Sequence, residues 1–471
     1  MATALAYLLI LINGLVSVAA PWVGITVAYL FALLTPQTIW FWTFEGVRPF
    51  LMVFMPVLLG FGLAVFAGKV QFSRLRTRIN ALLFVMWTCM TIAYYFGPYV
   101  DVVNAWRFFN PGYMFETLQK TYLTYLIGTL LINNDHKLKA VALVMVVTVV
   151  YMTWWTNAQY LFYGQWGRIG GPQTPSGEGI YRDENIFSTI FVVGIPFLFY
   201  FGKLVESRWL RWAVWAVIPF AWHAVFLTAS RGGLLGIAAT LALFILRSEK
   251  KLVGLLAVAA FAGAFAWQAG DVMTERAVSI GEYDEDASAT GRLEAWKAAS
   301  KMMATHPLTG VGFASFGQAF PSFSNAEPRI AHNTIFQIGA EWGLIAVTTY
   351  LILTFSTLNR LRKNGIQLRR RPWDERTRFL YCLNEATLIG FFGLFVCSMF
   401  LSLEAFELFY YLLLLANAVL VADTRFGSAT ADSTLAIPAR MTNRRRPPFE
   451  PASASRGSRP IRFGVPDRPE C

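Results

Sequence analysis

Long apolar runs are the feature that most restricts the fold of this chain. They recur from residue 3 to residue 423, and most extend over roughly 17 to 22 residues, enough to cross a hydrocarbon core of about 30 Å as a helix. In lipid only helices and closed barrels satisfy their backbone hydrogen bonds, and runs this continuous lack the alternation of barrel strands. Only 14% of the 471 residues are charged, against about 25% in soluble domains. We therefore predict an all-α polytopic membrane protein.

We expect about twelve transmembrane helices. Residues 3–35 hold two short runs separated by Pro21, each marginal in length for crossing alone, so we favour one broken span over two short ones. The other spans are predicted at residues 48–67, 80–97, 112–132, 139–156, 186–203, 210–228, 233–247, 252–270, 335–357, 379–401 and 404–423.

This pattern divides the chain into four parts. Membrane helices occupy residues 1–270, a large polar loop containing short helices follows at 271–334, and C-terminal membrane helices occupy 335–423. Residues 424–471 are rich in Arg, Pro, Ser and Ala without apolar periodicity, a composition typical of a disordered segment.

Basic loops alternate with polar or acidic ones along the chain. The basic set comprises residues 69–78, 137–139, 203–211, 247–251, 360–378 and the tail. Since excess Lys and Arg marks the cytoplasmic side of a membrane, we expect the tail in the cytosol and the acidic loop 271–334 outside it. The net charge of +12 is explained by this distribution and does not indicate a nucleic-acid partner.

Neither a metal nor a nucleotide cofactor is expected. Cys89, Cys382 and Cys397 fall within predicted spans and Cys471 is the last residue, so none has a partner at metal-ligand spacing and a disulfide framework is not expected. No Walker sequence is present. A membrane enzyme working outside the cytosol would therefore take its energy from an activated lipid donor.

His332 is the main candidate for a general base. It lies in Ala331-His332-Asn333, where loop 271–334 meets an apolar helix predicted from about Thr334. An imidazole with an ordinary pKa of about 6.5 can accept a proton from a hydroxyl at ambient pH, whereas the alternative is that His332 caps the helix. We expect local structural roles for the other histidines, His136, His223 and His306.

Arginines on the same side could bind a phosphate group. Arg231 stands between Thr228-Ala229-Ser230 and Gly232-Gly233 at the junction of two spans, where either anion binding or snorkelling to the interface is plausible. Arg292 shares a helical face with Trp296 on a helix predicted to begin near Thr290 and to end before His306-Pro307. Guanidinium groups bind phosphate oxygens in pairs, so converging arginines would make a diphosphate site. Further candidates are Arg168 and Arg182.

Several outer aromatics admit two interpretations. They could stack on sugars, but we favour anchoring at the membrane interface. The residues are Trp154, Trp155, Tyr160, Tyr163 and Trp166.

The sequence resembles the O-antigen ligase superfamily of bacterial inner-membrane proteins, which also includes O-antigen polymerases and O-glycosylation ligases. The similarity covers roughly residues 180–350 and rests on motifs that occur in the family's order. These are Thr228-Ala229-Ser230-Arg231-Gly232-Gly233, Gly291-Arg292-Leu293-Glu294-Ala295-Trp296, His306-Pro307-Leu308-Thr309-Gly310-Val311-Gly312, and Ala331-His332-Asn333 with Glu341-Trp342-Gly343-Leu344.

The resemblance implies a reaction and roles for three residues. Such enzymes move a glycan from undecaprenyl diphosphate to an acceptor hydroxyl in the periplasm, without metal or nucleotide. Arg231 and Arg292 would hold the diphosphate, and His332 would act on the acceptor hydroxyl. The acceptor could be a glycolipid, a glycan or a protein, which leaves ligase and polymerase as alternatives. From the residues alone, a membrane transporter of anions is the rival interpretation.

Overall fold

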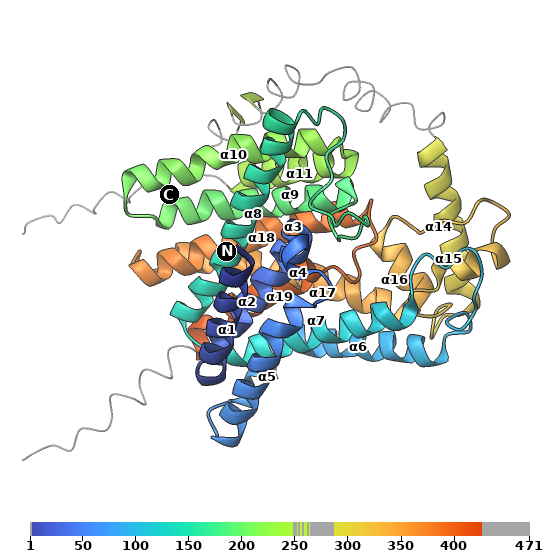
Figure 1. Cartoon of the computed structure of the whole chain (residues 1–471), viewed down its shortest axis with the longest axis horizontal. Helices are drawn as coiled ribbons and strands as arrows, with labels where there is room; N and C mark the ends of the chain where they lie inside the picture. Colours follow the sequence, from blue (N-terminus) through green and yellow to red (C-terminus); the bar gives the residue numbers. More distant parts are fainter. Residues whose placement is uncertain are drawn as a thin grey trace, which may run out of the picture.

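The computed structural model describes residues 2–247 and 287–425, together with a few isolated positions between them (Figure 1). Within these ranges all regular elements are helical, which confirms the predicted all-α class. Seven of the described helices are long and apolar enough to span a membrane. The span predicted at 252–270 and nearly all of the tail 424–471 lie outside the described residues.

Six of the seven spanning candidates match predicted segments to within several residues, whereas the helix Leu344–Arg369 begins well after the predicted start at residue 335. The seven candidates are α5 (Pro49–Phe66), α6 (Arg78–Phe96), α8 (Asp135–Tyr163), α9 (Glu184–Leu204), α10 (Arg208–Thr228), α17 (Leu344–Arg369) and α18 (Glu375–Ser398). Other apolar helices are α1 (Ala2–Ala19), α2 (Pro21–Leu34), α7 (Pro111–Leu131), α11 (Arg231–Arg247) and α19 (Glu407–Arg425). The break between α1 and α2 falls at Pro21, as the sequence predicted, because proline lacks the N–H that would continue the helix.

Helices α9 and α18 form the centre of the bundle. Most of both helices is buried, and they pack against each other and against α11. A glycine makes this approach possible: a Cβ on Gly393 of α18 would lie 2.5 Å from Thr240 of α11 and 2.8 Å from Val192 of α9. Small residues allow membrane helices to approach closely, and here Gly393 allows both α9 and α11 to approach α18.

The basic loops meet at one end of this bundle. Arg247, at the end of α11, donates to both carboxylate oxygens of the fully buried Glu385 of α18 at 2.6 and 2.8 Å. Arg369 of α17 donates to the Arg247 carbonyl, and Arg378 of α18 donates to the Lys203 carbonyl. Residues from three predicted basic loops, 203–211, 247–251 and 360–378, therefore share one end, which we call the basic end.

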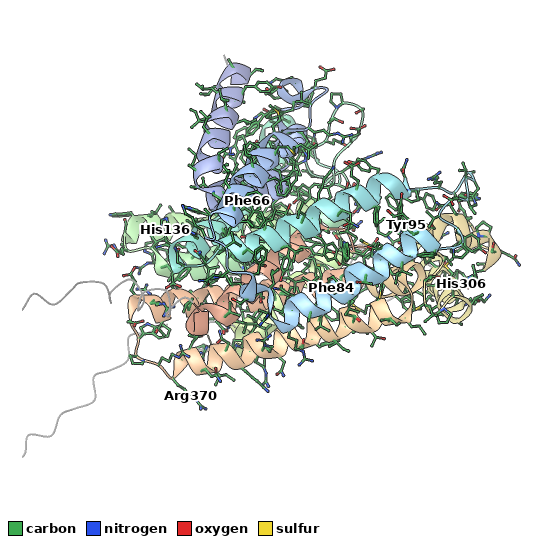
Figure 2. All side chains as sticks on the ribbon, turned by 90° about the horizontal axis from the view of Figure 1, so that it is seen from below. Phe66, Phe84, Tyr95, His136, His306 and Arg370 are labelled. Atoms are coloured by element: carbon green, nitrogen blue, oxygen red, sulfur yellow. The ribbon has the colours of Figure 1, made fainter. Side chains whose placement is uncertain are left out.

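The opposite end carries a small group of helices outside the bundle. It consists of α14 (Ala287–Thr305), α15 (Phe316–Ala319), the short 3-10 helix η2 (Phe320–Ser322) and α16 (Thr334–Trp342), and we call it the α14–α16 cluster. Figure 2 shows His306 of this region and Arg370 after α17 at opposite ends of the molecule. Outward aromatics such as Phe84 and Tyr95, 64% and 67% exposed, line the flank between these ends.

The α14–α16 cluster has its own apolar core. Helix α14 contributes a face of small and apolar residues to this core: Ala295, Ala298, Ala299 and Met302 are all buried and pack with Phe316 and Phe320. The helix begins at Ala287, slightly before the predicted Thr290, and ends at Thr305 ahead of the His306-Pro307 step. Loop 271–334 is therefore a folded unit over its described part.

The predicted continuous span 335–357 is wrong. The chain breaks at Gly343, which has φ 88° and ψ 176° and separates the nine-residue α16 from α17. A Cβ at Gly343 would lie 2.5 Å from the Leu308 carbonyl oxygen, and the Leu344 N–H donates to the Pro307 carbonyl at 2.8 Å. The close approach of this loop requires glycine and ends α16, so α16 belongs to the cluster and α17 to the membrane bundle.

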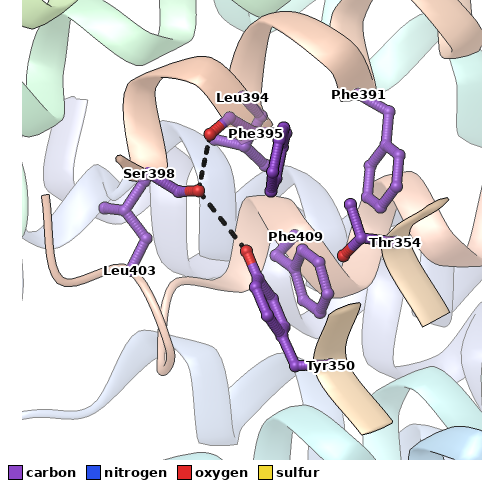
Figure 3. A pocket seen from close by; sticks show the side chains of 8 residues that line it. All are labelled: Tyr350, Thr354, Phe391, Leu394, Phe395, Ser398, Leu403 and Phe409. Carbon is purple, nitrogen blue, oxygen red and sulfur yellow. Dashed lines mark hydrogen bonds between the residues drawn. The ribbon is translucent and has the colours of Figure 1, made fainter. Parts of the chain in front are cut away.

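A small cavity lies inside the bundle between α17, α18 and α19 (Figure 3). Tyr350 and Ser398 approach each other there through their hydroxyl oxygens at 3.4 Å, and most of the remaining lining is apolar. None of the predicted site residues lines it. This cavity is therefore separate from the predicted site residues.

Candidate functional site

His332 lies two residues before α16, in a backbone conformation that is uncommon for residues other than glycine. Its φ is 47°, in the left-handed region, and the next residue, Asn333, caps the helix. The Asn333 Oδ1 atom accepts hydrogen bonds from the Ile335 and Phe336 N–H groups at 2.9 and 3.3 Å. Because Asn333 performs the capping, the alternative interpretation of His332 as the cap is wrong.

Charged groups from three separate segments influence the pKa of the imidazole. Burial lowers the pKa of His332 below its ordinary value, and the nearby Arg292 guanidinium lowers this pKa further. Asp183, before α9, opposes this effect, and Arg329 adds to the lowering. The histidine is therefore held toward its neutral form in a setting with two cations and one carboxylate.

Arg329 was not singled out from the sequence. Its guanidinium lies directly over Gly291, where an added Cβ would clash with the Arg329 Nη1 atom. The absence of a side chain at Gly291 is thus what lets a second arginine lie beside Arg292. Asp183 was also missed; its side chain caps α9 by accepting from the Asn185 and Ile186 N–H groups at 2.8 and 3.0 Å. No local pattern relates either residue to His332.

Arg231 is the first residue of α11 and follows a buried turn. Ala229 has a positive φ of 48°, and the Ser230 Oγ atom accepts from the Gly233 N–H at 3.1 Å. The Ser188 hydroxyl of α9 donates to the same oxygen at 3.3 Å. The turn is therefore attached to the first helical turns of α9, whose cap, Asp183, raises the pKa of His332 electrostatically.

A short segment after α18 joins the Arg231 turn to His332. The Asn333 Nδ2 atom donates to the Met399 carbonyl at 3.0 Å, and the Thr334 hydroxyl donates to the Leu401 carbonyl at 2.7 Å. Between these two acceptors, Phe400 packs on the other side against Gly232, where an added Cβ would lie 3.3 Å from the Phe400 Cβ. The neighbours of Arg231 and His332 thus contact one three-residue segment, which we call the 399–401 segment.

The remaining predicted arginines differ in their surroundings. Arg168 forms an ion pair with Glu184 at 3.3 Å and donates to the Thr228 carbonyl at 3.4 Å, so it lies beside the Arg231 turn with its charge balanced. Arg182 is exposed and donates to the Gly177 carbonyl within its own loop at 3.2 Å. The structure brings Arg168 to the candidate site and directs Arg182 toward its loop.

The outer aromatics separate into two groups. Trp155 packs edge-on against Phe187, and Tyr160 packs against His223, so both contribute to the bundle interior. Trp154, Tyr163 and Trp166 are 60%, 71% and 81% exposed. Within residues 2–247 and 287–425, no group of three or more His, Cys, Asp or Glu side chains is arranged to hold a metal ion.

Comparison with known proteins supports the motif-based resemblance. No curated protein matches the chain. A protein-family model described as O-antigen ligase matches residues 215–351, the region that contains Arg231, Arg292 and His332. This match confirms the resemblance predicted from the motifs: over residues 215–351 the chain is similar to the O-antigen ligase family.

Proposed function

We propose that this protein is a membrane glycosyltransferase that moves a glycan from undecaprenyl diphosphate to an acceptor hydroxyl at the His332 end of the bundle. The observation that carries the proposal is the position of His332: a half-buried imidazole, near Arg292 and Arg329, connected through the 399–401 segment to the Arg231 turn. The transfer requires stabilisation of an anionic leaving group, which the arginines would provide, and a proton acceptor, which His332 would provide.

The proposed reaction is a direct displacement. The acceptor oxygen would attack the anomeric carbon while the bond from that carbon to the diphosphate oxygen breaks, so the anomeric configuration inverts. His332 would take the proton from the acceptor hydroxyl, and the arginines would stabilise the negative charge that develops on the leaving diphosphate. The products are the glycosylated acceptor, undecaprenyl diphosphate and a proton released when the imidazolium deprotonates.

The neighbouring charged groups are consistent with His332 as the base and the arginines as the binders of the diphosphate. Burial, together with Arg292 and Arg329, lowers the pKa of His332, which favours the neutral base before reaction. A bound diphosphate would offset their charge, and Asp183 would stabilise the imidazolium as it forms. We assign diphosphate contact to Arg231 and Arg292, and a secondary contribution to Arg168, whose partner Glu184 holds it next to the Arg231 turn. Arg182 would contact substrate only after leaving Gly177.

The orientation follows from the two ends of the molecule. Lys- and Arg-rich segments gather at the basic end, and excess positive charge favours the cytoplasmic face. We therefore infer a multi-pass protein of the bacterial inner membrane with the basic end and the C-terminal tail in the cytosol and the His332 end in the periplasm.

A cysteine introduced at the exposed position Trp166 should react with a membrane-impermeant maleimide in intact spheroplasts, whereas one introduced at Arg370 should not.

Reconstitution is the most direct test of the proposed activity. Purified protein in liposomes would receive an undecaprenyl-diphosphate glycan with glycolipid, glycan or protein acceptors, and product would be measured for wild type, His332→Ala and Arg231→Ala. Transfer by wild type alone supports the proposal, and equal transfer by all three forms contradicts the assigned site. A ladder of lengthened glycans without added acceptor would identify a polymerase, whereas a single addition to a glycolipid or protein would identify a ligase.

The pH dependence of transfer should shift in opposite directions in two variants. Since the neutral imidazole is the active form, activity should fall as the pH drops through the His332 pKa, below about 6.5 in the wild type. Arg329→Gln removes a cation that lowers this pKa, so the acid limb should move to higher pH. Asp183→Asn removes a carboxylate that raises it, so the limb should move to lower pH.

These shifts would be read from kcat/KM between about pH 4.5 and about pH 8, the range that brackets an imidazole pKa. Asn can replace Asp183 as the cap of α9, which makes it a suitable neutral substitute. If the acid limb of the pH profile moved in the same direction in both variants, or did not move in either, His332 would not control the rate.

A further inference from the structure

Side chains hold both polar groups of the backbone at Ala331, one from the partly buried Trp296 and one from the buried Gln337. The Ala331 carbonyl accepts a hydrogen bond from the Trp296 indole Nε1 at 2.9 Å, and the Ala331 N–H donates to the Gln337 Oε1 atom at 3.0 Å. Ala331 is fully buried and Gln337 is 1% exposed. This carbonyl belongs to the peptide group that links Ala331 to His332, so the contact acts directly on the φ angle of His332.

The Gln337 amide is itself fixed on several sides. Its Nε2 atom donates to Glu341 Oε1 at 2.8 Å, and its Oε1 atom also accepts from the Ser402 hydroxyl at 3.1 Å. The same Glu341 carboxyl accepts from the Ala314 and Phe316 N–H groups at 3.1 and 3.0 Å. The amide orientation is therefore determined by its neighbours, and the contact to Ala331 is tied to the start of α15.

Trp296 is equally well held. Its ring stacks on Phe336 of α16 with centroids 5.3 Å apart and planes inclined by 10°, and it belongs to the same helix as Arg292. The indole N–H thus connects the helix that carries an arginine of the site to the backbone that carries the histidine. A left-handed φ at a non-glycine residue persists only where its surroundings impose it.

We propose that Trp296 and Gln337 are positioning residues that clamp the Ala331 backbone, hold His332 in its left-handed conformation and so direct the imidazole into the site beside Arg292. The importance of this clamp for glycan transfer rests on the proposed function, in which His332 is the base. The clamp itself does not depend on that assignment, because it concerns where the imidazole lies.

Trp296→Phe tests the clamp, because phenylalanine keeps an aromatic ring for Phe336 and removes the N–H. Trp342→Phe is the matched control: Trp342 is fully buried in α16, and its Nε1 has no hydrogen-bond partner among the described residues. Carbethoxylation of each histidine by diethyl pyrocarbonate would be followed by mass spectrometry at about pH 8, where imidazoles are neutral and the rate reports access. His306 serves as the internal reference.

We expect His332 in Trp296→Phe to react several-fold faster relative to His306 than in wild type or Trp342→Phe. With the lipid-linked donor, kcat should fall about 10- to 100-fold with little change in KM, since small displacements of a reacting group are costly. The acid limb of kcat should move toward the ordinary imidazole pKa as burial decreases. Should Trp296→Phe fold poorly, Gln337→Met gives the same carbethoxylation readout from the other side of the clamp.

The outcomes separate this inference from the proposed function. Unchanged His332 reactivity in both Trp296→Phe and Gln337→Met would overturn the clamp, whatever happens to transfer. Faster reaction of His332 with undiminished transfer would establish the clamp and contradict the role of His332 as base. Faster reaction together with the loss of kcat supports both.

Discussion

Replacing His332 with asparagine is expected to lower kcat for glycan transfer by about 10²- to 10⁴-fold, the contribution typical of a positioned general base. Asparagine is the informative replacement because it adopts the left-handed conformation more readily than most residues, so the φ of 47° can be kept while the base is removed. Donor affinity should change little, since the arginines remain. Product formation at saturating donor, measured in liposomes, checks this prediction.

His306→Gln provides a matched control for this change. His306 lies at the same end of the molecule but packs between other aromatic rings, those of Tyr99 and Phe323. Its replacement should leave kcat within a few-fold of wild type. Full transfer by His332→Asn in folded protein would remove His332 from the chemistry, and equal losses in both histidine variants would point to a general disturbance of the α14–α16 cluster.

Removing the guanidinium of Arg292 should produce a comparable loss. Arg292→Ala is expected to lower kcat/KM by about 10²- to 10³-fold, as deletion of a single charge-stabilising donor does in other enzymes. Arg292→Lys should recover only part of this loss, because an ammonium keeps the charge without the paired N–H groups that match phosphate oxygens. Initial rates at several donor concentrations would separate binding of the diphosphate from its stabilisation in the transition state.

The control for Arg292 lies on the same helix. Lys297 is 67% exposed and pairs with Glu294 at 2.7 Å, so Lys297→Ala removes a positive charge from α14 without removing one from the site. We expect transfer by this variant to remain close to wild type. A loss in Lys297→Ala as large as that in Arg292→Ala would mean that the overall charge of α14 matters, and not a contact made by Arg292.

Much of the bundle was predictable because long apolar runs have few structural solutions in lipid. The predicted boundaries of α5, α6, α7 and α9 lie within a few residues of those observed. The division of 335–357 into α16 and α17 was missed because the sequence on both sides of Gly343 is apolar and continuous. What ends the helix there is the approach of Pro307 and Leu308, a contact between segments that hydrophobicity does not encode.

In the candidate site, too, contacts between segments far apart in the sequence could not be predicted. His332, Arg231 and Arg292 could be proposed because each stands beside glycine, serine or asparagine residues in recognisable motifs. Asp183 and Arg329 could not be proposed, because only the fold brings them close to the site. Asp183 lies before a different helix, and the Arg329 guanidinium lies against Gly291. The hydrogen bond from the Trp296 indole to the Ala331 carbonyl could not be predicted from the sequence either. The spacing of Trp296 from Arg292 predicted a shared face, and only the fold shows the Ala331 carbonyl opposite the indole.

The links through the 399–401 segment consist of uncharged groups. An amide and a hydroxyl donate to backbone carbonyls there, and a phenyl ring rests on a glycine. Screening by dissolved salt barely affects such contacts, whereas it weakens attraction between guanidinium groups and a diphosphate. Rising ionic strength should therefore slow capture of the lipid donor long before it loosens the framework that aligns the reacting groups.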